Sequence, residues 1–424
     1  MKKILVLSVG SSAEPIVKAI RNYKPDFVYF FCSSGPKGSE VTIASPGDPC
    51  GDKRQSKCPE CGHEYYPGDP KGKAIVFQTG LEKDQYEIVT ISDPDDLNGS
   101  YQKLLSLVET INAKYGDCHV IANYTGGTKT MSVAMALVGI MTQQWDLSLN
   151  IGPRVDLIRV RAGDVPVVID KWQLFYQSQL ESIGRLLDHY YYAYVARSIS
   201  EMLLQPLDKS LQDKLIVLRT ICEAFDLWDK FQHQKALELL EPFGSLFAHY
   251  LINVRKMLGQ ARATGYEQVA DLLNNADRRA AQECYDDAIA RLYRATELFA
   301  QVRLEKEYGY NSSDLKLEQL PDDLQKVYGG CVRGNKLILG LRDDYELLLK
   351  LGDPVGKKYE ERKGRMIDAI KRRNYSISAH GLTPLVEEDY LYVKDKLEGI
   401  ILDAANEIGL NLEMDQLPGR EILQ

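Results

Sequence analysis

The sequence predicts an α/β domain followed by an all-α region. Within residues 1–175, short apolar segments typical of strands alternate with segments of helical periodicity. From about residue 176 the strand pattern disappears, and apolar residues recur every three or four positions. A chain of 424 residues is long enough for two or three domains. The fold class is therefore α/β plus all-α.

The first part of the chain supplies strands and helices in turn. Its strand segments are continuous apolar runs or alternating patterns: 3–9, 27–33, 86–92, 118–125, 147–152 and 165–170. Its helical segments are 13–23, 96–116 and 128–144. Such alternation predicts a mostly parallel, Rossmann-like sheet. The Gly- and Pro-rich stretch 44–72 interrupts this pattern, and we expect an insertion in the sheet domain.

The second part is expected to be helical throughout. Residues 213–244 predict a pair of helices broken near Phe231–His233, and residues 286–309 predict a long amphipathic helix. We divide the chain into a sheet domain at 1–175, a helical linker region at 176–265 and an all-helical domain at 266–424.

Bulk composition narrows the class of protein. The formal charge of −8 argues against a surface that coats nucleic acid, so such a contact requires a local patch. No apolar run approaches the length of a membrane helix. The N-terminal "MKKILVLSVG" resembles a signal peptide, but its apolar run is short and no small-residue cleavage site follows. We expect a buried first strand and a cytoplasmic protein.

The stretch "NYTGGTKT" at 123–130 connects a predicted strand to a predicted helix. Gly126 and Gly127 allow a sharp turn, and the helix start offers free N–H donors next to Thr125, Thr128 and Lys129. The spacing fits neither the P-loop nor the dinucleotide fingerprint. Either the turn binds an anionic ligand, such as a nucleotide, or it is a glycine turn without one. A second turn of this kind carries Ser11 and Ser12.

Three cysteines and a histidine cluster in the insertion: Cys50, Cys58, Cys61 and His63. The Cys-Pro-x-Cys-Gly spacing is typical of zinc knuckles, because both thiolates then lie on one turn. Cys50 and His63, or Cys32 in place of one of them, would complete four ligands. We predict a structural zinc ion here, against the alternative of a loop with free thiols.

A polar pair interrupts the apolar stripe of the helix expected from about residue 362. Met366, Ile370 and Ile377 mark the stripe, and its continuation passes through Arg373 and His380. On one continuous helix these two would share a face about 10 Å apart. They could be satisfied by a carboxylate on a neighbouring helix, or they could line a cleft for a phosphate. Residues 357–374 carry eight Lys or Arg against three acids, which favours the cleft.

Arg373-Asn374-x₅-His380 matches the R-x₄₋₆-H signature of HEPN ribonuclease domains. The segment 285–301 looks like an earlier HEPN helix, and "NYTGGTKTMSVAMAL" resembles the ligand loop and helix of CARF domains. Together they resemble the CARF–HEPN ancillary ribonucleases of type III CRISPR systems. The cysteine insertion is not a general feature of that family.

This resemblance implies a homodimeric, single-stranded endoribonuclease of antiviral defence, activated by cyclic oligoadenylate. It implies that Arg373 and His380 are catalytic with Asn374 in support, and that the ligand contacts come from Ser11, Ser12, Thr125, Gly126, Gly127, Thr128 and Lys129. Cleavage would proceed through 2′-OH attack without a metal cofactor, and no stable DNA binding is expected. Two alternatives stay open: a nucleotide-responsive regulator that binds DNA or protein without cleavage, and a HEPN-like toxin or scaffold.

Overall fold

The computed structural model describes residues 1–35, 38–46, 49, 55–65, 74–152, 154–155, 159–160, 164–334, 336–374, 376 and 381–423. The chain divides into two compact units, Met1–Gln179 and Leu180–Gln424. The three-part division made from the sequence stays a prediction. In the part of the chain so described, no helix is long and apolar enough to span a membrane.

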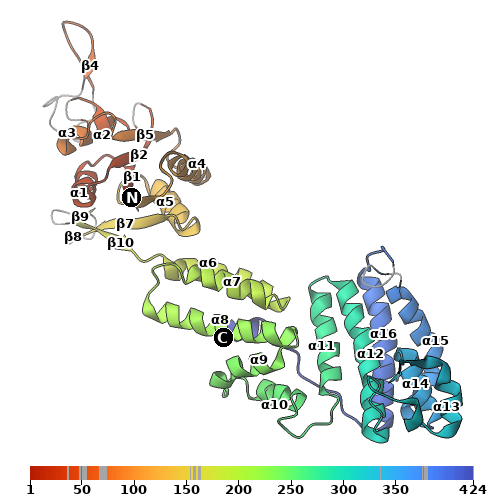
Figure 1. The fold of residues 1–424 in the computed structure, drawn as a ribbon. Coiled ribbons are helices and arrows are strands. Elements are labelled where there is room, and N and C mark those ends of the chain that lie inside the picture. Colours follow the sequence, from red (N-terminus) through yellow and green to blue (C-terminus); the bar gives the residue numbers. More distant parts are fainter. Residues whose placement is uncertain are drawn as a thin grey trace. The chain divides into compact units, whose positions relative to one another are not determined.

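Unit 1 is built around a six-stranded sheet with the order β10-β7-β6-β1-β2-β5 (Figure 1). Its strands are β1 (Lys2–Val9), β2 (Phe27–Ser33), β5 (Tyr86–Ile91), β6 (Cys118–Asn123), β7 (Trp145–Ile151) and β10 (Val165–Ile169). Neighbouring strands run parallel except β10, which pairs antiparallel with β7. The predicted mostly parallel sheet is confirmed.

Helices cover both faces of this sheet. They are α1 (Glu14–Tyr23), α2 (Val41–Ala44), α3 (Ile75–Thr79), α4 (Leu97–Tyr115) and α5 (Lys129–Met141). Side chains alternate along β1: Ile4 and Val6 pack with α4 and α5, whereas Leu5 and Leu7 pack with α1, α2 and α3. Burial on both faces explains why the strand is a continuous apolar run. Two small hairpins, β3 (Ser56–Lys57) with β4 (Glu64–Tyr65) and β8 (Arg154–Val155) with β9 (Arg159–Val160), complete the unit.

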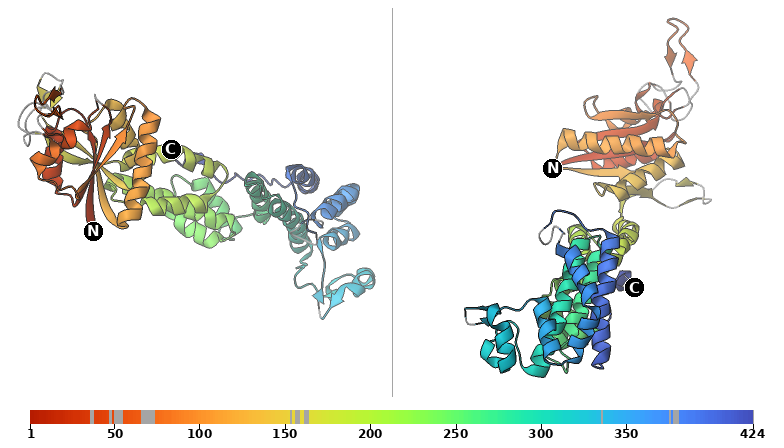
Figure 2. Two further views of the ribbon diagram at one scale, coloured as in Figure 1. Left: turned by 90° about the horizontal axis from the view of Figure 1, so that it is seen from above. Right: turned by 90° about the vertical axis from the view of Figure 1, so that its right-hand side faces the viewer.

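Unit 2 is helical, as predicted (Figures 1 and 2). Its helices are α6 (Trp172–Asp188, which begins in unit 1), α7 (Tyr192–Met202), α8 (Lys209–Asp229), α9 (His233–Leu240), α10 (Ala248–Met257), α11 (Glu267–Ala281), α12 (Tyr285–Tyr308), α13 (Asp322–Tyr328), α14 (Leu341–Lys350), α15 (Pro354–Asn374) and α16 (Glu387–Glu407). A short hairpin pairs β11 (Val332–Arg333) with β12 (Lys336–Leu337). One core joins α11, α12, α14, α15 and α16.

The segment after α16 returns across α11 to the first helices of unit 2. Gln416 accepts a hydrogen bond from Arg278 at 2.6 Å, and the Tyr192 hydroxyl donates to the carbonyl of Pro418 at 2.6 Å. Arg420 forms an ion pair with Asp188 at 2.5 Å. These contacts hold the segment along its length, and we refer to residues 408–423 as the C-terminal segment.

Candidate functional site

The glycine turn of unit 1 lies at the carboxyl end of the parallel strands. It connects β6 to α5, and the Thr128 side chain caps the helix by accepting from the N–H of Met131 at 3.2 Å. Gly127 has a φ of +82°, and a Cβ on Gly126 would lie 2.3 Å from the Ser8 carbonyl oxygen. Both glycines are therefore required, one by backbone conformation and one by close approach.

The two predicted loops lie side by side. The Ser8 hydroxyl donates to the carbonyl of Gly126 at 2.6 Å, and a Cβ on Gly10 would lie 3.0 Å from the Gly127 nitrogen. Exposed Ser11 and Ser12 follow the first turn, and exposed Lys129 begins the helix after the second. The structure thus brings all seven predicted ligand-contact positions to one edge of the sheet, where open α/β sheets bind ligands.

A buried polar network supports this edge, and the sequence analysis missed it. The N–H of Asn150 donates to the Thr125 hydroxyl at 2.8 Å, and its amide donates to Asp164 at 2.9 Å. Lys18 forms an ion pair with Asp164. Burial alone would raise the pKa of Asp164, but the hydrogen bonds from Lys18 and Asn150 outweigh it and lower that pKa. The sequence does contain a sign of this network: the polar residues Asn123 and Asn150 lie near the ends of two otherwise apolar strands.

Arg373 lies in the last turn of α15 and stacks on an aromatic ring. Its guanidinium carbon is 4.9 Å from the centre of the Tyr293 ring on α12. Its Nη1 donates to the Asn374 side chain over a long 3.4 Å, while its buried Nε has no hydrogen-bond partner in the described structure. Nor does any described carboxylate form an ion pair with it. Arg373 is therefore a half-buried cation with unused donors.

The neighbouring Arg372 is different. Its guanidinium stacks on Tyr392 at 4.3 Å and also forms an ion pair with Asp389. Four further cations of the basic stretch have carboxylate partners: Lys358, Arg362, Lys363 and Lys371. Among the described residues, only Lys357, Arg365 and Arg373 of the eight stay unpaired. The basic patch is thus smaller than the sequence suggested, and Arg373 belongs to its unpaired part.

The helix that carries Arg373 ends earlier than expected. It stops at Asn374, and Ser376 instead forms a β-bridge with Thr383. The prediction of one continuous helix through position 380 was wrong, because the backbone at Ser376 already pairs with Thr383 instead of continuing the helix. His380 and Ile377 lie outside the described residues. The pairing of Arg373 with His380 remains a prediction from the motif.

The chain after this segment returns to α12. The N–H of Leu385 donates to the side chain of Asp286 at 3.1 Å, and Tyr285 lies 6.3 Å from Tyr390, measured between ring centres. Asp286 precedes Tyr293 by about two helical turns. The start of α12 therefore holds the chain at Leu385, five residues after the predicted catalytic His380.

The cysteine pair forms a knuckle on the β3–β4 hairpin. The N–H of Cys58 donates to the His63 carbonyl, and the N–H of Gly62 donates to the Cys58 carbonyl, both at 2.8 Å. Backbone N–H groups of Cys61 and Glu60 lower the pKa of the Cys58 thiol. This arrangement fits half of a zinc site.

The predicted zinc ligand set is not complete in the described structure. Cys50 lies outside the described residues. Within those residues, no group of three or more His, Cys, Asp or Glu could hold a metal, so His63 does not join the two thiols. Cys32, considered as a substitute, is buried in β2, where burial raises its pKa to about 12.

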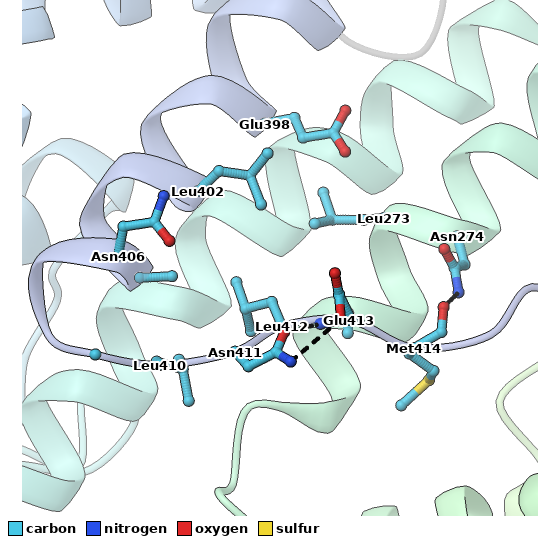
Figure 3. A pocket seen from close by; sticks show the side chains of 13 residues that line it. Leu273, Asn274, Glu398, Leu402, Asn406, Leu410, Asn411, Leu412, Glu413 and Met414 are labelled. Carbon is cyan, nitrogen blue, oxygen red and sulfur yellow. Dashed lines mark hydrogen bonds between the residues drawn. The ribbon is translucent and has the colours of Figure 1, made fainter.

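A cavity of about 560 Å³ lies between α11, α16 and the C-terminal segment (Figure 3). Glu398 and Glu413 line it, and the described residues around it include no lysine or arginine. Burial raises the pKa of Glu398, which lies on α16 across from Leu273 in Figure 3. A phosphate would be repelled there, so this cavity is not a candidate for the RNA-cleaving site.

Unit 1 is thus a Rossmann-like domain whose two predicted ligand loops lie together at one edge of the sheet. Unit 2 is a helical domain with the half-buried Arg373 at the end of α15. Residues 259–402 match the family model of the Csm6 HEPN domain. The chain is also similar to Enterococcus italicus Csm6 bound to cyclic hexa-2'-fluoro-hexa-dAMP, with a TM-score of 0.61 and 13% identity over 96% of this chain and 95% of that chain. No curated protein matches it significantly. The resemblance to CARF–HEPN ancillary ribonucleases and the fold class are confirmed.

Proposed function

We propose that this protein is a cytoplasmic, single-stranded endoribonuclease of CRISPR antiviral defence, switched on by cyclic oligoadenylate. The observation that carries the proposal is the state of Arg373. A guanidinium with a buried, unpartnered Nε lies in the segment that matches a HEPN domain. Such a group is suited to an oxyanion, because arginine binds phosphate through paired N–H donors.

The proposed chemistry needs only side chains and the RNA itself. The 2′-oxygen attacks the adjacent phosphorus while the bond from phosphorus to the 5′-oxygen breaks, which leaves a 2′,3′-cyclic phosphate and a 5′-hydroxyl. His380 takes the proton of the attacking hydroxyl or gives a proton to the leaving oxygen, and water exchanges the other proton. Arg373 stabilises the charge that grows on the phosphate oxygens, with Asn374 beside it. No step requires a metal ion.

Unit 1 would hold the activator. The start of α5 offers free N–H donors and a partial positive charge, with Lys129 as a full one. Thr125, Gly126, Gly127 and Thr128, with Ser11 and Ser12 opposite, would contact a cyclic phosphodiester. The cyclic ligand bound to the similar Enterococcus italicus protein supports this ligand class.

Two exposed apolar patches support a homodimer. Val133, Leu137 and Met141 follow one another at four-residue spacing along α5 and are 48%, 36% and 60% exposed. In unit 2, Leu382, Val386 and Leu391 are exposed beside the predicted catalytic segment. A second copy that covers these residues would remove them from water and would bring two Arg373 side chains to one cleft.

The direct test is cleavage of a fluorescent single-stranded RNA with and without cyclic tetra- and hexa-adenylate, each with and without EDTA. We expect cleavage that depends on one of the two activators and survives the chelator. Binding of the activator without any cleavage would overturn the nuclease assignment in favour of a regulator. Loss of cleavage with EDTA would contradict the metal-independent mechanism.

A further inference from the structure

The turn between α6 and α7 presents aromatic rings to solvent. The rings of His189 and Tyr191 are nearly parallel, with an interplanar angle of 19° and 6.5 Å between their centres. Tyr194 lies edge-on to Tyr191, with 5.6 Å between ring centres, and is 59% exposed. His189 and Tyr194 are exposed and Tyr191 between them is half-buried, and such a group of accessible rings is unusual on a protein surface that has no partner.

Hydrogen bonds hold the rings of His189 and Tyr191 in place. A ring nitrogen of His189 is 2.9 Å from the carbonyl oxygen of Arg185, and the Tyr191 hydroxyl donates to the Gln282 carbonyl at 3.4 Å. The Gln282 side chain donates in turn to the Tyr190 carbonyl at 3.1 Å. These two rings therefore lose little conformational freedom when a flat group stacks on them.

Two arginines flank the rings without a carboxylate partner in the described structure. Arg185 lies one turn before His189 on α6, and Arg197 follows Tyr194 by three positions on α7; both are exposed. The acidic residues nearby on α6, Asp188 and Glu181, are within ion-pair distance of Arg420. Available positive charge thus lies next to the aromatic rings. We call Arg185, His189, Tyr191, Tyr194 and Arg197 the aromatic surface.

A cavity of about 550 Å³ opens between this surface and the turn from α11 to α12. Arg185, His189 and Tyr191 line one side, and Gln282 and Glu283 line the other. Within unit 2, Tyr190 and Tyr191 of the α6–α7 turn are hydrogen-bonded to Gln282 in the turn between α11 and α12. Tyr293, which stacks on Arg373, lies about 12 Å along α12 from its start at Tyr285. The aromatic surface is therefore at the same end of the helical bundle as the proposed cleavage centre.

We propose that the aromatic surface binds single-stranded RNA outside the cleavage centre. Bases would stack on His189, Tyr191 and Tyr194, and Arg185 and Arg197 would pair with phosphates. Proteins that bind single strands without sequence preference combine these two features, since every base has a flat face and every linkage a charge. The biological role of the surface rests on the proposed nuclease function, but the binding itself does not require cleavage.

The test measures RNA binding and cleavage separately. Binding is followed by fluorescence anisotropy of a labelled single-stranded RNA of about 25 nucleotides in the full chain that carries His380→Ala. Replacing Tyr194 and Arg197 together by alanine should weaken binding about tenfold, because a stacked base and a phosphate contact are both lost. Tyr194→Phe should retain the affinity, since the ring remains. Glu283→Gln should tighten binding, because a carboxylate beside the phosphates is removed.

Tyr65→Ala, which removes an exposed tyrosine from unit 1, is the matched control and should leave affinity unchanged. With the cleaving chain, the double variant should raise KM for long RNA and leave kcat unchanged. Unchanged affinity of the double variant, or equally tight binding of duplex RNA, overturns the RNA-binding surface and leaves the nuclease proposal intact; a protein-binding surface would give the first of these results. Weakened binding by the double variant, together with a wild-type chain that does not cleave RNA even with activator, supports the surface and overturns the nuclease proposal.

Discussion

The glycine turn of unit 1 and the end of α15 treat their polar groups in opposite ways. At the turn, the Thr125 hydroxyl accepts from the Asn150 N–H at 2.8 Å, and Asn150 is bonded in turn to Asp164. At the end of α15, the Nε of Arg373 is buried and unbonded within the described structure. The polar groups of the glycine turn are hydrogen-bonded to one another, whereas the Nε of Arg373 has no hydrogen-bond acceptor among the described residues.

This difference separates the requirements of a sensor from those of a phosphate-binding centre. A network that satisfies its own members fixes the backbone, so that the N–H donors of the turn point in set directions before a ligand arrives. An unsatisfied buried donor costs roughly 1–3 kcal/mol, and an anion that binds it relieves this cost. Binding of a phosphate should therefore be more favourable at Arg373 than at the neighbouring cations that already have carboxylate partners.

Substitution of Arg373 tests whether the guanidinium with the unbonded Nε is needed for cleavage, and it should have the largest effect. Arg373→Ala should lower the cleavage rate at least about 10²-fold, the scale for loss of a group that stabilises transition-state charge. Arg372→Ala is the matched control, because that arginine already stacks on Tyr392 and pairs with Asp389. Single-turnover cleavage measures both, and equal losses would contradict a special role for Arg373.

Mixed dimers test whether the cleavage centre needs two chains. One chain would be wild type and the other would carry His380→Ala, with different affinity tags to isolate the heterodimer. Two-fold symmetry places both predicted pairs around one cleft, so activity per dimer should fall far below half. Half-activity would mean that each chain carries an independent site.

Substitutions in the glycine turn test whether this hydrogen-bonded region binds the activator. Thr128→Ala with Lys129→Ala should raise the activator concentration needed for half-maximal cleavage by about tenfold, because a charge and a hydroxyl at the helix start are lost. Activity at saturating activator should be unchanged. Lys103→Ala removes an exposed lysine from α4 and is the control. Thr128→Ser, which keeps the helix cap, should behave as wild type.

Asp344 offers a smaller, pH-dependent test within the core of unit 2. Burial raises the pKa of this carboxyl group to about 7, and Glu297 and Asp343 add to the effect. Neither oxygen has a hydrogen-bond partner of ordinary geometry, although Ser312 and Gln301 lie near enough to lower the pKa in part. The unfolded value is about 3.9, so the folded chain keeps a proton that the unfolded chain loses between about pH 4 and 7.

Stability should therefore fall as the pH rises through that window and level off above it. Asp344→Asn should remove this part of the pH dependence and raise the melting temperature most at pH 8. The stabilisation there should amount to a few kcal/mol at most, at about 1.36 kcal/mol for each unit of pKa difference. Melting curves of both proteins from pH 5 to 8 measure the effect, and parallel curves would refute it.

The knuckle of the β3–β4 hairpin should have the smallest effect on catalysis. We expect about one zinc ion per chain by elemental analysis, with Cys58 and Cys61 among its ligands. Cys58→Ser should lower both zinc content and melting temperature, whereas RNA cleavage should hardly change. Cys118→Ser, in a strand of the same unit, should leave the zinc content unaltered. Well-folded wild-type protein without zinc would end this hypothesis.

The features that the sequence predicted share a local cause. Burial on both faces makes β1 a continuous apolar run, and the glycines at 126 and 127 are dictated by the conformation of one turn. Arg373 was found because a charged residue interrupts an apolar stripe. Each of these signals lies within a few residues of the feature that it predicts.

The features that the sequence did not predict depend on tertiary contacts. Tyr293 is 80 positions before Arg373, and nothing in either segment indicates that the two would stack. The end of α15 was misplaced because the apolar periodicity continues through Ile377, whereas Ser376 already pairs with Thr383. The neutralised cations of the basic stretch were counted as free, since partners such as Asp389 and Asp403 come from α16.

The C-terminal segment makes unit 2 mechanically stiff. Arg278 is 0% exposed and bonds at once to Asp229 of α8, Asp271 of α11 and Gln416 of this segment. Rotation of α8 against α11 would leave these buried charges without partners, at a cost of several kcal/mol. If α6 were displaced, unit 2 would therefore move as one rigid body and would not bend.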